Sequence, residues 1–150
     1  MKQISSKRQD IIDNGYTWLG TPYQHQACVK DYGVDCAMLI AGVARDSNLI
    51  KPNDFKQIPP YPSDWHLHRE NPILLDVLES FGCKSKQINK KHPGDILVFK
   101  LGKTASHLGI LVHDNLFIHA YGGGVGKVAI NSLTGKWENR LCGLYKFPGI

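Results

Sequence analysis

The sequence predicts an α+β fold in which N-terminal helices pack on one face of a C-terminal antiparallel sheet. Two observations lead to this expectation. Up to Gly82, apolar residues recur at helical spacing or form an apolar run behind a helix cap. From Asp95 onward, short apolar segments alternate with Gly, Asn and Asp turns, which is typical of strands. Helices followed by a strand meander indicate α+β, and 150 residues fit one domain, residues 1–150.

Three helices are expected before the sheet. The first covers about residues 7–19, whose apolar residues share one face, and it stops at a glycine. The second covers residues 36–45 behind Asp35, a good N-cap, and because it is apolar all round we expect it at the centre of the domain. The third begins with Asn71 as its N-cap and ends at Gly82.

A proline-rich segment and a set of strands complete the expected fold. Residues 51–70 contain four prolines, which predicts a structured loop without a regular element. A loop this long in a compact domain often borders a binding site, so we expect Tyr61 or Trp65 to help hold a substrate. The strands are expected at residues 95–100, 108–112, 117–120, 127–130 and 142–147.

Composition excludes several classes of protein. The net charge of +5 includes no dense Lys/Arg cluster, which gives nucleic-acid binding little support, although a mildly basic surface suits an acidic polymer such as a cell wall. No apolar run approaches the roughly 18 residues that span a bilayer. The polar N-terminus contains no secretory signal, so we expect synthesis in the cytoplasm and free thiols. None of the four cysteines forms a C-x-x-C pair, which disfavours a zinc knuckle.

Cys36 is the first candidate for chemistry. It stands in the first turn of the expected buried helix, where unpaired N–H groups and the helix dipole favour a thiolate and could hold an oxyanion. A cysteine at such a position is, on its own, more often a packed core residue. Two histidines favour the catalytic interpretation of Cys36, because a nucleophile needs a base within reach and a third group that orients the base.

His107 and His119 fall on consecutive strands, 12 positions apart. In a regular hairpin with an even loop they would face opposite sides of the sheet. An odd loop or one bulge around residues 113–116 would place both on the same face, close enough for one ring to hydrogen-bond the other. Cys36, His107 and His119 could then supply nucleophile, base and orienting group.

Four segments, in order and with matching spacing, resemble the NlpC family of papain-like cysteine peptidases, which cut bacterial peptidoglycan peptides. The resemblance runs from about residue 10 to Pro148. Two further segments, residues 23–27 and 61–66, are similar to small single-domain members encoded with bacteriophage tail genes. The four family segments are Gly20-Thr21-Pro22-Tyr23, Val34-Asp35-Cys36-Ala37-Met38-Leu39-Ile40, Pro93-Gly94-Asp95-Ile96-Leu97-Val98-Phe99, and His107-Leu108-Gly109-Ile110-Leu111-Val112 with Phe117-Ile118-His119-Ala120.

The resemblance implies a role for each matched residue. Cys36 would be the nucleophile and its backbone N–H part of the oxyanion hole, His107 the general base and His119 the third member. Tyr23 would help to bind substrate through its hydroxyl. Met38 departs from the family, which usually has glycine two places after the nucleophile, and this leaves the shape of the pocket open.

Other residues carry weaker hypotheses. Asp64, His66 and His68 could bind a metal, but two histidines in a loop are a poor site, and no metal or cofactor is expected. The glycines at 122–124 suggest a loop that lets substrate approach the backbone. His25 could line the cleft or be an ordinary surface residue. Cys28, Cys83 and Cys142 are interpreted as packing residues.

The leading functional hypothesis is hydrolysis of a peptidoglycan stem peptide. By resemblance, the bond follows γ-D-glutamate and precedes diaminopimelate, the protein acts at the cell wall after delivery, and phage tail proteins are its potential partners. Two alternatives stay open. One is an acyltransferase of related fold, although Cys36 precedes His107 here and the order is reversed in the permuted acyltransferases. The other is a catalytically idle tail or wall-binding structural protein.

Overall fold

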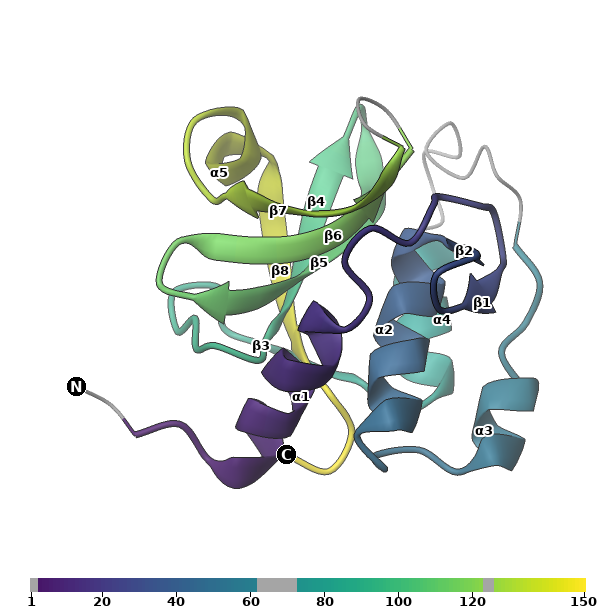
Figure 1. Cartoon of the computed structure of the whole chain (residues 1–150). Coiled ribbons are helices and arrows are strands. Elements are labelled where there is room, and N and C mark those ends of the chain that lie inside the picture. Colours follow the sequence, from purple (N-terminus) through teal and green to yellow (C-terminus); the bar gives the residue numbers. More distant parts are fainter. Residues whose placement is uncertain (1–2, 62–72, 123–125) are drawn as a thin grey trace.

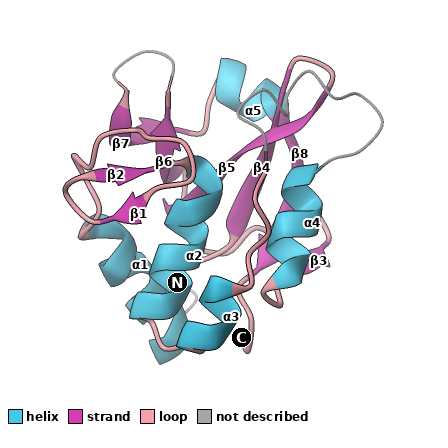
Figure 2. Cartoon of the chain, turned by 90° about the vertical axis from the view of Figure 1, so that its right-hand side faces the viewer, coloured by secondary structure: helices cyan, strands magenta, loops and turns pink. Residues whose placement is uncertain are grey.

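The computed structural model describes residues 3–61, 73–122 and 126–150 and has two layers (Figure 1). The helices α2, α3 and α4 lie on one side and the main sheet on the other, with α1 beside both (Figure 1). Figure 2 views the molecule from the helix side. The helices are α1 (Ser6–Tyr16), α2 (Cys36–Asp46), α3 (Pro52–Lys56), α4 (Ile73–Ser80) and α5 (Lys136–Arg140).

The main sheet has six strands in the order β3-β8-β4-β5-β6-β7, and every neighbouring pair is antiparallel. A separate two-stranded ribbon, β1 (Cys28–Val29) with β2 (Gly33–Val34), precedes α2. The predicted α+β class is therefore confirmed. The strands of the main sheet are β3 (Lys84–Lys86), β4 (Ile96–Leu101), β5 (Thr104–His113), β6 (Leu116–Tyr121), β7 (Lys127–Ser132) and β8 (Leu141–Lys146).

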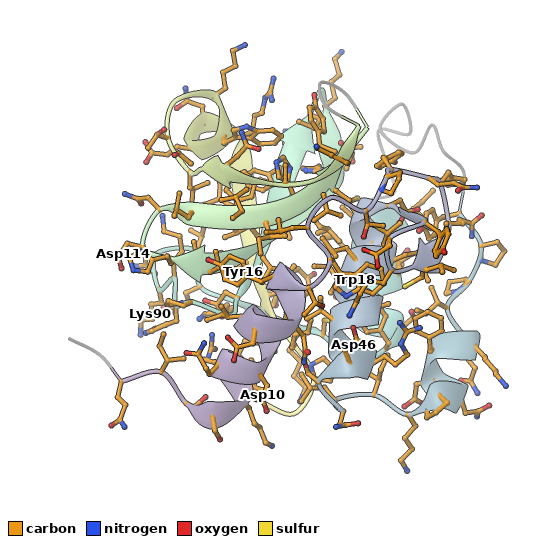
Figure 3. All side chains as sticks on the ribbon, viewed as in Figure 1. Asp10, Tyr16, Trp18, Asp46, Lys90 and Asp114 are labelled. Carbon is orange, nitrogen blue, oxygen red and sulfur yellow. The ribbon has the colours of Figure 1, made fainter. Side chains whose placement is uncertain are left out.

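The helix α2 is the centre of the larger core, as its apolar sequence predicts. Its first nine residues are all buried. Gly42 allows the Trp18 ring to pack directly on this helix, because a Cβ at Gly42 would lie 2.6 Å from that ring. The indole N–H of Trp18 donates to Asp46 Oδ2 at 3.0 Å, and Figure 3 shows the two side chains facing each other. Packing and a polar anchor thus hold the helix that begins with Cys36.

Alternation along the strands creates a second, smaller core on the other face of the sheet. Ile96 and Val98 face the helices α1, α2 and α4, whereas Leu97 and Phe99 face away from them. Trp137 of α5 packs against this second cluster. The expectation that helices cover one face is therefore incomplete, since α5 covers part of the other.

Several predicted element boundaries are wrong. The segment 51–70 contains a helix, α3, because Pro52 suits a first helical turn and Asp54 accepts a hydrogen bond from the Lys51 N–H at 3.1 Å. The first helix ends at Tyr16 and turns follow it. β5 begins at Thr104 and not at the expected residue 108, so His107 lies within this strand. The predicted start of the third helix at Asn71 lies outside the described residues.

Candidate active site

Cys36 is the first residue of α2, and Asp35 is its N-cap as predicted. Asp35 Oδ1 accepts from the N–H of Met38 at 2.9 Å, and the backbone carbonyl of Asp35 accepts from Leu39 N–H at 2.9 Å. The first of these bonds satisfies one of the N–H groups that a helix start leaves free, and the second is the first hydrogen bond of the helix itself. The N–H groups of Cys36 and Ala37 remain, and both interact with the Cys36 sulfur. They are the donors available to an oxyanion at this position.

Asp35 is also the centre of a buried polar cluster that supports the start of α2. Its Oδ2 accepts from the hydroxyl of Tyr61 and from the N–H of Gln26, both at 2.6 Å. His25 Nδ1 lies 3.7 Å from the same oxygen, and His25 Nε2 lies 2.9 Å from the carbonyl oxygen of Tyr61. His25 is therefore half-buried and held against this cluster, and its place at the edge of a cleft stays a prediction. Together these contacts fix the residue that precedes Cys36.

The hairpin between β5 and β6 contains the irregularity that the histidine pair requires. Leu111 pairs with Phe117, but His113 pairs with Leu116, so one residue of β5 is extra. This bulge brings His107 and His119 onto the same face, and His107 Nε2 lies 2.7 Å from His119 Nδ1. The predicted bulge and the predicted contact between the two rings are both confirmed. The catalytic roles of the two residues stay a prediction.

Aromatic side chains surround the histidine pair on the face of the sheet that α5 covers. The Trp137 ring lies 5.5 Å from His107 and 4.9 Å from His119, and Tyr121 lies 5.3 Å from His107, all measured between ring centroids. Gly109 makes room for this packing, because a Cβ there would lie 2.8 Å from the Phe117 ring. The pair is consequently shielded, with His107 only 3% and His119 only 1% exposed.

Burial sets the protonation of the pair in the resting protein. It lowers the pKa of His107 well below 6.5, and the charges of His119 and Arg140 act in the same direction. Burial also lowers the pKa of His119, and the hydrogen bond that His119 donates to the amide oxygen of Asn131 opposes this effect. Both rings are therefore neutral near pH 7, as a general base must be before it accepts a proton.

The expectation of a resting thiolate at Cys36 is wrong. Burial raises the pKa of the Cys36 thiol, and the charge of Asp35 adds to this effect. The N–H groups of Leu108, Ala37 and Cys36 lower it again, but they do not outweigh desolvation. The site therefore holds a neutral thiol and a neutral imidazole, and the thiol must lose its proton during the attack.

The backbone of β5 reaches Cys36 at the residue that follows His107. The backbone N–H of Leu108 interacts with the Cys36 sulfur, which places the thiol beside the strand that carries the base. Among the described residues, no hydrogen bond joins the Cys36 thiol to the His107 ring. A general base can close such a gap when substrate binds, because catalytic hydrogen bonds often tighten only in the complex.

The predicted substrate-binding residues differ in their positions. Burial raises the pKa of the Tyr23 hydroxyl, and the neighbouring Cys36 and Asp35 add to this effect, which places Tyr23 close to the start of α2. Its ring packs on Gly122, where a Cβ would lie 3.1 Å away, so this glycine makes room for a side chain of the protein itself. Tyr61 is only 4% exposed and its hydroxyl binds Asp35, which assigns it a supporting position; substrate contact by Tyr61 stays a prediction. Trp65 lies outside the described residues.

The remaining candidates lie apart from these residues. All four cysteines are free thiols, as predicted, but Cys142 is exposed, so its interpretation as a packing residue is wrong. Asp64, His66 and His68 are outside the described residues, and within those residues no group of three His, Cys, Asp or Glu side chains could hold a metal ion. In the same part of the chain, no helix is long and apolar enough to cross a membrane.

Sequence reasoning missed three residues that contact the histidine pair or lie close to it. Asn131 Oδ1 lies 2.7 Å from His119 Nε2. Trp137 packs on both rings, and the Arg140 guanidinium lies 5.1 Å from the Trp137 ring centroid. The short helix that carries Trp137 and Arg140 has no apolar repeat that could reveal it. The sequence feature that could have revealed this helix is a single tryptophan within a polar segment, Lys136-Trp137-Glu138-Asn139-Arg140.

The structure thus joins a helix that begins with cysteine to an antiparallel sheet that carries two adjacent histidines. The chain belongs to the NlpC/P60 family, whose family model matches residues 16–146. The predicted family is therefore confirmed. No curated protein matches the sequence significantly.

Solved structures share the fold at low sequence identity. An NLP/P60 family protein from Staphylococcus aureus, described as similar to lipoprotein, has a TM-score of 0.65 and 18% identity and covers 100% of this chain. The chain spans only 44% of that protein. The NlpC/p60 domain of the peptidoglycan hydrolase SagA has a TM-score of 0.61 and 18% identity, covering 91% of this chain and 96% of that domain. The peptidoglycan hydrolase RipB from Mycobacterium tuberculosis has a TM-score of 0.54 and 15% identity, covering 93% of this chain and 63% of that one.

The lowered pKa of His107 predicts how activity will depend on pH. A protonated His107 could not accept the thiol proton, so activity is lost only as the pH falls through this lowered pKa. We therefore expect kcat/KM to stay nearly constant between about pH 7.5 and about pH 6. An acid limb centred at or above the ordinary histidine pKa of 6.5 would contradict the buried neutral pair. The measurement is a pH–rate profile of the free-enzyme parameter kcat/KM.

Proposed function

We propose that the protein is a cysteine peptidase that hydrolyses amide bonds in bacterial peptidoglycan stem peptides. The observation that carries the proposal is the 2.7 Å contact between His107 Nε2 and His119 Nδ1, on a sheet packed against the helix that begins with Cys36. Membership of the NlpC/P60 family supports it. So do the two structural neighbours described as peptidoglycan hydrolases, SagA and RipB.

The proposed reaction has two halves. As the Cys36 sulfur attacks the carbonyl carbon of the amide, its proton moves to Nδ1 of His107, and the N–H groups of Cys36 and Ala37 bind the oxyanion. His107 then gives this proton to the leaving nitrogen, the C–N bond breaks, and a thioester with Cys36 remains. In the second half, water loses a proton to His107 and attacks the thioester carbonyl. The C–S bond breaks, the acid leaves, and His107 returns the proton to the Cys36 sulfur.

The proposal also specifies the bond that is cleaved and the place where the protein acts. The cleaved bond would follow γ-D-glutamate and precede diaminopimelate, as the family resemblance implies. The protein would act at the cell wall after delivery, with the phage tail as the proposed carrier. The net charge of +5 is compatible with an acidic wall polymer but does not select among polymers.

Digestion of purified cell walls tests the proposed function. Walls are incubated with the protein, and new free amino groups are identified by mass spectrometry, with the Cys36→Ala variant as the control. The proposal expects a new amine on diaminopimelate, released only by the unsubstituted protein. No release at any protein concentration would favour a wall-binding structural role. Transfer of an acyl group to an added amine, without net hydrolysis, would favour an acyltransferase.

A further inference from the structure

The strand β7 adds a third polar group behind the histidine pair. In the β6–β7 register, Phe117 pairs with Asn131 and His119 pairs with Ala129, so Asn131 lies diagonally across from His119 on the same face. Asn131 Oδ1 lies 2.7 Å from His119 Nε2. The three side chains therefore form a chain of two short hydrogen bonds, from His107 through His119 to Asn131.

When both rings are neutral, these two hydrogen bonds fix which nitrogen of each ring carries the proton. An amide oxygen can only accept, so His119 Nε2 must carry a proton and donate it to Asn131. The other nitrogen of a neutral imidazole has no proton, so His119 Nδ1 accepts from His107 Nε2. His107 Nδ1 is then left with a free lone pair, which is the atom that must take the proton from Cys36.

We propose that Asn131 is a positioning residue, which acts through His119 to hold His107 in the tautomer that can act as a base. Only the use of this tautomer, as the base for Cys36, rests on the proposed function. If the amide were reversed, its NH₂ group would donate to His119, and both rings would carry their protons on the opposite nitrogens. His107 Nδ1 would then be protonated and could not accept from Cys36. The orientation of one amide at the sheet edge thus decides whether the base is competent.

Asn131 also contributes once His107 is protonated. The imidazolium donates from Nε2 to His119, whose own N–H donates to the amide oxygen of Asn131, so the negative end of the amide dipole faces the positive charge. A carboxylate at the same position would stabilise the imidazolium further and raise its pKa. Asn131→Asp and Asn131→Leu therefore have different expected effects, although both remove the amide.

The test uses these two variants, with Ser132→Ala on the neighbouring exposed residue as the matched control. Asn131 is itself exposed, so neither variant should disturb the core. Asn131→Leu should lower kcat about 10-fold and leave KM unchanged. Loss of such a supporting group typically lowers activity by about 10- to 100-fold, and an exposed residue is expected at the lower end. Asn131→Asp should keep most of the activity and move the acid limb of the pH–rate profile to higher pH. Ser132→Ala should change neither quantity.

A second readout does not depend on any substrate. The ¹⁵N chemical shifts of the imidazoles report which ring nitrogen carries the proton, and His107 should be protonated at Nε2 in the unsubstituted protein and mixed in Asn131→Leu. This readout tests the positioning role even if the protein fails to hydrolyse cell walls. Unchanged tautomers together with unchanged kcat in Asn131→Leu would overturn the proposal. So would an unsubstituted protein in which His107 carries its proton on Nδ1.

Discussion

Cys36→Ala should abolish hydrolysis of peptidoglycan peptides, with a loss of about 10⁴-fold or more in kcat. The reason is that the variant removes the only atom proposed to form the thioester, while the oxyanion donors and the histidine pair stay in place. The measurement is release of free amines from purified walls by the variant and by the unsubstituted protein. Residual activity within about 100-fold of the unsubstituted protein would show that another residue is the nucleophile.

The fold should tolerate this change, which makes the result interpretable. Cys36 occupies the first turn of α2, where Asp35 caps the helix through Met38 and Leu39 and does not depend on the thiol. Alanine also has the highest helix propensity. Circular dichroism and the thermal unfolding midpoint of Cys36→Ala should therefore stay close to those of the unsubstituted protein. A matched variant, Cys83→Ala, removes a buried thiol elsewhere and should keep its activity.

His119→Leu should lower kcat by about 100-fold, whereas His119→Gln should keep much more of the activity. Leucine would leave the Nε2–H of His107 without an acceptor in a buried site, and the tautomer of the base would no longer be held. The side-chain oxygen of glutamine can accept the same hydrogen bond. Steady-state kinetics of both variants on one defined stem peptide provide the comparison.

Equal activity in the two His119 variants would contradict the orienting role. Both replacements put a side chain of comparable length on the same position of β6, so a purely steric role predicts similar losses. The kcat of His119→Gln relative to His119→Leu thus isolates the hydrogen bond. Thermal unfolding of each variant separates this effect from a general loss of stability.

Local signals predicted the parts of the site that lie on regular elements. The apolar run behind Asp35 predicted a buried helix that begins with Cys36, and the structure confirms it. Because strands alternate their side chains, His107 and His119 could share a face only with an odd loop or a bulge between them, and the register shift after Leu111 is such a bulge. In both cases a short-range rule of backbone geometry was sufficient.

The partners of these residues could not be predicted in the same way. Tyr61 binds Asp35 from 26 positions away, and Asn131 binds His119 from a neighbouring strand, so neither contact leaves a local pattern. The protonation of Cys36 was mispredicted for a related reason. A helix start favours the thiolate, but the extent of burial, which raises the pKa of the thiol, depends on packing by distant segments.

The most direct test of the central claim, that His107 serves as the base for Cys36, is the rate of alkylation of Cys36 by iodoacetamide near neutral pH. The Cys142→Ser background removes the exposed thiol that would compete, and Cys36 should then react ahead of Cys28 and Cys83. Introducing His107→Gln should slow alkylation of Cys36 by about 10-fold or more, because a buried thiol with a raised pKa needs a base to lose its proton. Cys28, whose pKa is raised to about 12 by burial, should react equally slowly in both proteins. Alkylation of Cys36 at the same rate with and without His107 would contradict the pairing of nucleophile and base.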